Sequence, residues 1–310
     1  MRRRKLPEQS YSAYQSLPAN RVRLSASQWL AVHQSGEWRP DLTPIVCLPG
    51  YIRNMSDFAD LIPLLRSLTG ENWPVAALDL RGRGRSSDRP AVSSYSTVAD
   101  AEDVGAVLAA LGVEKCLVLG QDHGGHVAMA LAAQRPALLA GAILIDAGPV
   151  LDSRGLVRMR SNLAHVEASR TREQAQDALE HILSADYPGL DAATVERLSA
   201  RLYFTAKGGR PLPLFDPALL ARLKDVESED VFEPQWLLFN ALAHVPVLLA
   251  RSQLTDQLRR ETFEEMAQRR QDSVSITIAG QGSPALLNGV DEVGALADFV
   301  KFATANKRRG

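Results

Sequence analysis

One glycine-rich turn is the segment of the sequence that is most informative about catalysis. Residues 117–125 read LVLGQDHGG, so Asp122 stands between Gly120 and Gly124. An apolar run precedes the turn, a helical pattern follows it, and the glycines permit a bend too tight for a side chain. Such a bend would lift the Asp122 carboxylate above a sheet, beside a helix N-terminus, where it could act as a nucleophile or transfer a proton. The structural alternative is an ordinary glycine turn with Asp122 as an N-cap.

Apolar runs that alternate with helical patterns surround this turn. Continuous apolar strands that alternate with helices are typical of a parallel sheet covered on both faces. Partial alternation at 22–33 predicts an antiparallel hairpin before that sheet. The sequence therefore predicts a mostly parallel α/β fold, with ligands bound at the carboxyl ends of the strands. The predicted strands are 44–48, 75–80, 115–119, 141–145, 245–250 and 274–278, and the predicted helices are 57–68, 98–111, 127–133, 261–270 and 290–303.

The alternation is interrupted between about residues 151 and 235. This segment is helical and charged, without a clear strand-like run. We interpret it as an all-helical cap inserted between two parts of an α/β core, 21–150 and 236–310. Residues 1–20 are interpreted as a polar N-terminal lead-in. Cys47 and Cys116 fall within strand-like runs and are expected to be core residues.

The bulk properties exclude several classes of partner. The 310 residues carry a net charge of −1, with 45% hydrophobic and 23% charged residues, which is typical of a globular protein. The charge provides no field for nucleic acid, no apolar stretch approaches the roughly 18 residues of a membrane span, and no Cys/His cluster has zinc spacing. The N-terminus lacks the apolar stretch of a secretory signal. We therefore expect a cytoplasmic protein with no cofactor or metal that binds a small molecule, while its oligomeric state stays open.

Four motifs make the chain similar to the α/β-hydrolase family over about residues 20 to 305. They are 48–51 (LPGY), 79–86 (DLRGRGRS), 120–125 (GQDHGG) and 251–258 (RSQLTDQL). The resemblance implies the α/β-hydrolase fold, a mostly parallel central sheet flanked by helices, with a helical cap and with Asp122 at the nucleophile elbow. It also implies that Asp256 is the supporting acid. The backbone N–H groups of Tyr51 and His123 would form the oxyanion hole.

Two departures from the family pattern bear on the mechanism. Asp122 replaces the usual serine, which resembles epoxide hydrolases and haloalkane dehalogenases, in which a carboxylate forms an ester that a histidine-activated water cleaves. The segment that matches the family's histidine loop reads AGQGSP, so Ser283 stands where the histidine belongs. A serine hydroxyl cannot act as a base near pH 7 without a partner. The resemblance thus implies an atypical catalytic triad of Asp122, Asp256 and Ser283.

Another histidine could replace the missing base. His123 adjoins the elbow, His126 lies one helical turn beyond Asp122, and two further histidines lie in the predicted cap. For each of them the structural alternative is an exposed or packing histidine. The complete set is His33, His123, His126, His165, His181 and His244.

Several other side chains have both a structural and a functional interpretation. Asp146 follows the run 141–145 and is either a second candidate acid or the start of a loop. Trp236 and Phe239 are expected to line the pocket or to pack beneath the cap. Three arginines of the 79–86 motif are interpreted as surface charge rather than as phosphate ligands: Arg81, Arg83 and Arg85.

The sequence leaves more than one function class open. The first is a hydrolase that acts on a small, largely apolar substrate through Asp122, either covalently or by proton transfer alone. The second is a noncatalytic ligand-binding or interaction protein, a pseudoenzyme on the same scaffold, which the combination of Asp122 and Ser283 favours. An Asp122 carboxylate that faces a lidded apolar cavity would favour chemistry, whereas an arginine partner on Asp122 would favour binding.

Overall fold

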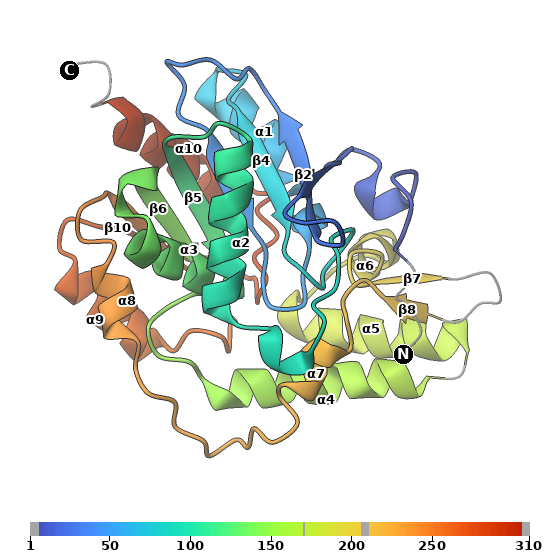
Figure 1. Ribbon diagram of the computed structural model, residues 1–310. Helices are drawn as coiled ribbons and strands as arrows, with labels where there is room; N and C mark the ends of the chain where they lie inside the picture. The colour runs from blue at the N-terminus through green and yellow to red at the C-terminus, as the bar shows by residue number, and fades with distance from the viewer. Residues whose placement is uncertain (1–5, 170, 206–210, 306–310) are drawn as a thin grey trace.

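An eight-stranded sheet forms the centre of the structure (Figure 1). The computed structural model describes residues 6–169, 171–205 and 211–305. The strand order is β1-β2-β4-β3-β5-β6-β9-β10, in which β1–β2 and β2–β4 pair antiparallel and the other neighbours pair parallel. The mostly parallel sheet and its preceding hairpin are confirmed. The strands are β1 (Asn20–Arg23), β2 (Trp29–Ser35), β3 (Ile45–Leu48), β4 (Val75–Asp79), β5 (Cys116–Gln121), β6 (Leu139–Ile145), β9 (Val247–Ser252) and β10 (Val274–Ile278).

Helices cover both faces of this sheet and create two apolar cores. Side chains of a strand point alternately to opposite faces, so Val46 and Leu48 join one core whereas Ile45 and Cys47 join the other. Cys47 and Cys116 are buried and free, as expected. The first core packs on α2 (Thr97–Ala110), α3 (His123–Gln134), α8 (Trp236–Asn240) and α9 (Arg260–Arg269), and the second on α1 (Leu61–Thr69) and α10 (Val290–Ala305).

The inserted segment, residues 151–235, crosses the carboxyl edge of the sheet (Figure 1). The prediction that it is all-helical is wrong, because β7 (Tyr203–Thr205) and β8 (Pro211–Pro213) form an antiparallel pair within it. Strands of three residues are too short to show readable alternation, and the prolines of β8 argue against a strand in the sequence. The helices of the segment are α4 (Ser153–Ala168), α5 (Arg172–Asp186), α6 (Ala192–Ser199) and α7 (Ala218–Ala221).

The N-terminal segment is more than the predicted polar lead-in. Tyr14 and Leu17 are buried in the second core, and the guanidinium carbon of Arg85 lies 4.0 Å from the centre of the Tyr14 ring. This aromatic contact anchors residues that the polar composition of 1–20 suggested were solvated. Short 3₁₀ turns complete the fold: η1 (Ser12–Tyr14), η2 (Met55–Phe58), η3 (Val92–Ser94) and η4 (Pro136–Leu138).

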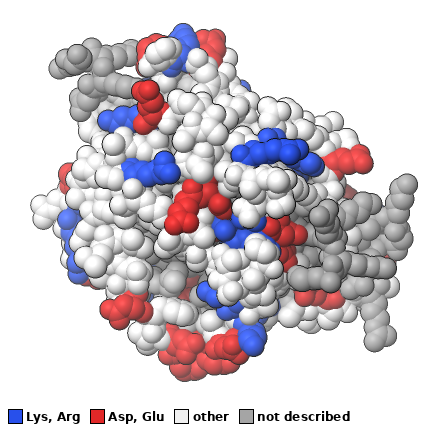
Figure 2. Space-filling model, viewed as in Figure 1, with Lys and Arg blue, Asp and Glu red and all other residues white. Residues whose placement is uncertain are grey.

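The surface charges of both signs are mixed. On the face shown in Figure 2, acidic and basic side chains are interspersed, and acidic ones gather at its lower edge. This distribution follows the near-zero net charge of −1. Among the described residues, no helix combines the length and the apolar character needed to cross a membrane.

Candidate functional site

Asp122 occupies a strained turn between β5 and α3. Its φ is +47°, a region that costs a non-glycine residue about 1–3 kcal/mol. Its backbone N–H donates to the Ile145 carbonyl at 2.8 Å, which fixes the turn against β6. A Cβ on Gly120 would lie 2.3 Å from the Gly124 carbonyl oxygen, and one on Gly124 would lie 2.0 Å from the Leu48 oxygen. The predicted strand–turn–helix therefore depends on both glycines.

The Asp122 carboxylate is held by one backbone donor. The N–H of Tyr51, in the loop after β3, donates to Asp122 Oδ2 at 3.1 Å. His123 is the first residue of α3, whose first N–H groups have no acceptor within the helix. The Asp122 side chain is half-buried, and no described arginine pairs with it. The arrangement is that of a carboxylate with one oxygen in a backbone donor site and the other available.

A small cavity of about 90 Å³ lies over Asp122. The inserted segment supplies its apolar wall, and the core supplies Asp122 and Ser283. Two of the three residues of the predicted triad therefore line one cavity. The apolar wall consists of Met159, Leu163, Ile182, Leu183 and Leu202, and further polar lining comes from Arg53, Arg158, Asp186, Tyr187 and Gln257.

Asp256, the predicted acid, faces a different partner. It does not line the cavity, and its carboxylate forms an ion pair with Arg158 of α4. Arg158 also contacts Asp186 of α5 at 3.0 Å. The bond to Asp256 is the leading cause that raises the pKa of Arg158 above its ordinary value. Among the described residues, the charged partner of Asp256 is thus Arg158, and no arginine forms an ion pair with Asp122.

The carboxyl group of Asp146 interacts electrostatically with that of Asp122. Gln121 and Ile145 are paired in neighbouring strands, so Asp122 and Asp146 follow them side by side. Asp146 has a φ of +51°, and its two oxygens accept bonds from the Ser252 N–H and hydroxyl, each at 2.7 Å. Burial raises the pKa of Asp146 to about 7, and the charge of Asp122 acts in the same direction. The structure therefore places Asp146 at the same edge of the sheet as the elbow.

No described histidine lines the cavity. His123 Nε2 lies 2.9 Å from Asp100 Oδ2, and His126 Nε2 lies 3.0 Å from the Gly148 carbonyl oxygen. Burial lowers the pKa of His126, while the Asp122 charge opposes that effect. His165 and His181 are exposed. Each candidate for a substitute base thus has a structural partner or faces solvent.

Two aromatic residues expected at the pocket lie elsewhere. Phe239 is fully buried in the first core, against the sheet and α3. The Trp236 ring lies beneath the Arg269 guanidinium, whose carbon is 3.8 Å from the ring centre. Neither residue lines the cavity. The prediction that they line it is wrong, because α8 packs on α3 rather than under the inserted segment.

The interpretation of three arginines as surface charge is also wrong. Arg81, Arg83 and Arg85 are all buried. The 79–86 loop folds beneath the inserted segment, where the Gly84 N–H donates to the Leu214 carbonyl and the Asp216 N–H to that of Gly82. No local pattern predicts the acidic partner of Arg83, which is Asp100 on α2. Among the described residues, no cluster of three His, Cys, Asp or Glu side chains could hold a metal ion.

Comparisons with known proteins assign the family. Residues 43–229 match the model of the alpha/beta hydrolase fold. The chain is 27% identical over 254 residues to the 3-hydroxybutyrate-oligomer hydrolase of Cupriavidus necator, covering 79% of this chain and 85% of that protein. It is 34% identical over 113 residues to an sn-1-specific diacylglycerol lipase of Danio rerio, covering 36% of this chain and only 34% of the relative.

Solved structures agree with this family. An alpha/beta hydrolase from Novosphingobium aromaticivorans is 28% identical and superposes with a TM-score of 0.78, covering 92% of this chain and 98% of that one. A putative hydrolase from Rickettsia typhi, 18% identical with a TM-score of 0.74 over 92% of this chain and 99% of that one, shares the fold. With a family model that matches more than half of its length, the chain belongs to the alpha/beta hydrolase fold family.

Proposed function

We propose that the protein hydrolyses a small, largely apolar substrate through covalent attack by Asp122. One observation carries the proposal: Asp122 lines the cavity with Oδ2 bonded to the Tyr51 N–H. Among the described residues, none donates a hydrogen bond to the second oxygen, Oδ1. That oxygen is available to a substrate carbon.

The reaction would proceed in two steps. Oδ1 attacks an electrophilic carbon, and the leaving group departs with its bonding electrons as halide or, from an epoxide, as the ring-opened alkoxide. The product of this step is an ester of Asp122 whose carbonyl oxygen stays near the Tyr51 N–H. Water then adds to the ester carbon, the oxyanion hole stabilises the charge that develops, and the alcohol leaves.

The cavity walls support the substrate class. Side chains of Met159, Leu163 and Leu183 present apolar surface, and the cavity volume of about 90 Å³ favours a small molecule. We propose that residues 151–235 act as the cap that provides this wall. The hydrolytic activity named for the Cupriavidus necator relative supports hydrolysis as the reaction class. The carboxylate at the elbow favours a substrate with a displaceable group on carbon.

The second step has no evident base. Ser283 faces the cavity at the position of the family's histidine, and no described histidine lines it. Without a base, attack of water on the ester should lose about 10²–10⁴-fold in rate. We therefore expect the Asp122 ester to accumulate.

Intact-protein mass spectrometry tests the proposal. The protein is incubated with 1,2-epoxybutane, 1-bromobutane and p-nitrophenyl acetate, and adducts are assigned by peptide mapping. We expect a single adduct on Asp122 with the epoxide or the bromide. Asp122→Asn is the matched control, since it keeps size and shape but lacks the nucleophilic charge, and it should remain unmodified. Neither adduct nor product with any of the reagents would contradict the proposal and support a noncatalytic binding protein.

A further inference from the structure

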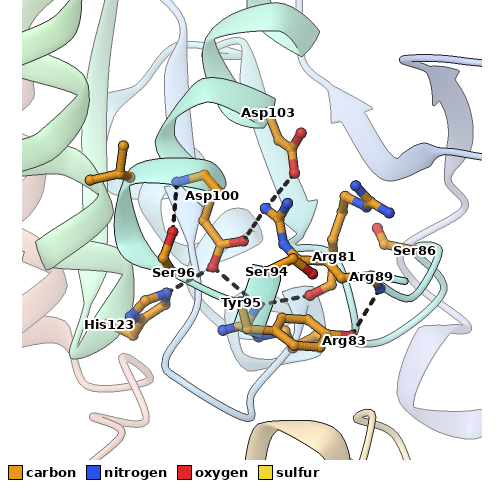
Figure 3. Close-up of polar contacts among 12 residues, drawn as sticks. Arg81, Arg83, Ser86, Arg89, Ser94, Tyr95, Ser96, Asp100, Asp103 and His123 are labelled. Atoms are coloured by element: carbon orange, nitrogen blue, oxygen red, sulfur yellow. Dashed lines mark hydrogen bonds and ion pairs between the residues drawn. The ribbon is translucent and has the colours of Figure 1, made fainter. Parts of the chain in front are cut away.

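A buried polar network reaches His123, the residue after the elbow aspartate (Figure 3). Its centre is Asp100 on α2, a carboxylate with 1% of its surface exposed. Asp100 Oδ2 accepts bonds from Arg83 Nη1 at 3.1 Å and from His123 Nε2 at 2.9 Å. Asp100 Oδ1 accepts a bond from Arg89 Nη2 at 2.8 Å. Three donors from two segments, the loop after β4 and the start of α3, therefore meet on one side chain.

Two of these donors lead directly to the oxyanion hole. Arg83 Nε donates to the Tyr51 carbonyl oxygen at 2.7 Å, one peptide beyond the N–H that binds Asp122. The His123 imidazole is on the same residue as the second backbone donor, the His123 N–H. The Tyr51 and His123 rings also meet edge to face, with centroids 5.4 Å apart. Both halves of the oxyanion hole are thus tied to Asp100.

The electrostatics favour the charged form of Asp100. Burial by itself raises the pKa of Asp100, but Arg83, His123 and Arg89 outweigh burial and hold that pKa below its ordinary value. Buried ion pairs contribute little net stability compared with apolar residues of similar shape. A buried charge whose partners Arg83 and His123 adjoin the two proposed backbone donors is better explained by geometry than by stability.

We propose that Asp100 is a positioning residue that sets the spacing of the Tyr51 and His123 backbone N–H groups around residue 122. It acts through the Arg83 guanidinium on one side and the His123 imidazole on the other. The inference rests on the proposed function, because it assigns a purpose to the same oxyanion hole. It adds that the hole depends on a carboxylate that never touches the substrate.

The test removes the Asp122 carboxylate from the oxyanion hole and measures how a small anion binds in its place. Asp122→Gly removes the carboxylate, and glycine readily adopts the positive φ at this position. Formate then serves as the probe, and its affinity is measured from the amide chemical shifts of Tyr51 and His123. Asp100→Asn is introduced in this background. The matched control is Asp103→Asn, since Asp103 lies on the same helix and binds Arg89 at 2.6 Å but contacts neither Tyr51 nor His123 among the bonds of the described residues.

We expect formate binding at the oxyanion hole to weaken in Asp100→Asn but not in Asp103→Asn. Asp100→Asn should weaken formate binding about 10-fold or more and shift both amides before formate is added, while Asp103→Asn stays within about 2-fold. Equal effects of the two variants, or no formate binding at the two amides in Asp122→Gly itself, would overturn the proposal.

A second variant covers a failure of Asp100→Asn to fold. His123→Phe keeps the ring volume and removes one donor to Asp100, and it should shift the amide of residue 123 and weaken formate binding. An unchanged formate affinity in His123→Phe would also overturn the proposal. None of these readouts requires turnover, so a failure of Asp122 to form an ester would be detected separately.

Discussion

The two halves of the carboxyl edge of the sheet differ in the polar groups that they carry and in the partners of those groups. In the first half, after β3, β4 and β5, Asp122 meets the Tyr51 N–H, and a buried network lies behind both. In the second half, after β6, β9 and β10, Asp146 is occupied by Ser252 and Asp256 by Arg158, and Ser283 faces the cavity. Under the proposed function, this difference means that the groups for binding and attack are in place, whereas no imidazole of the described residues lines the cavity to activate water.

Restoring the base should have the largest effect. Ser283→His places an imidazole at the cavity, so the lifetime of the Asp122 ester should shorten by about 10²–10⁴-fold. Decay of the adduct is followed by mass spectrometry after excess reagent is removed. Ser283→Asn is the control, because it adds a polar group of moderate size without a base. Equal rates of ester decay in both variants would show that a missing imidazole is not what limits hydrolysis of the Asp122 ester.

Breaking the network in the first half should have the next largest effect. Arg83→Met removes the cation from a fully buried pair and leaves Asp100 undercompensated, which we expect to cost about 3–5 kcal/mol of unfolding free energy. Urea denaturation measures this change. A loss below about 1 kcal/mol would mean that the buried network does not hold the first half together.

The titration of Asp146 should give a smaller, pH-dependent effect. Its pKa of about 7 in the fold lies above the ordinary carboxyl value, so the folded protein binds this proton more tightly than the unfolded chain. This contribution is fully present below the unfolded pKa and is lost as the pH rises through about 7.

At about 1.4 kcal/mol per pKa unit, the loss amounts to a few kcal/mol. Relative to Asp146→Asn, which stays neutral, the wild-type protein should lose unfolding free energy between pH 5 and pH 8. Denaturation profiles that run parallel over this range would contradict the assignment.

The ion pair in the second half should matter least for stability. Arg158 is about one-third exposed, with 36% of its side chain accessible, so solvent screens its pairs with Asp256 and Asp186. Arg158→Met should change the unfolding free energy by only about 0–1 kcal/mol. A cost as large as that of Arg83→Met would remove the contrast between the two halves.

The local signals in the sequence predicted the sheet and the elbow. The central strands β3, β4 and β5 are largely apolar, fully buried runs and the turn carries its own glycines, so neighbouring residues contain the information. The ion pairs Arg158–Asp256 and Arg83–Asp100 join separate segments of the sequence, so no local sequence pattern predicts them. The prediction that Trp236 and Phe239 line the pocket is wrong for the same reason, because the packing of α8 on α3 depends on contacts between distant segments.

The most direct measurement is a single turnover in H₂¹⁸O with protein in excess over 1,2-epoxybutane and prolonged incubation. If Asp122 attacks carbon and water then cleaves the ester, the label enters the Asp122 carboxylate and the first diol carries unlabelled oxygen from the protein. Label found in the first diol, with an unlabelled Asp122 peptide, would contradict covalent attack by Asp122.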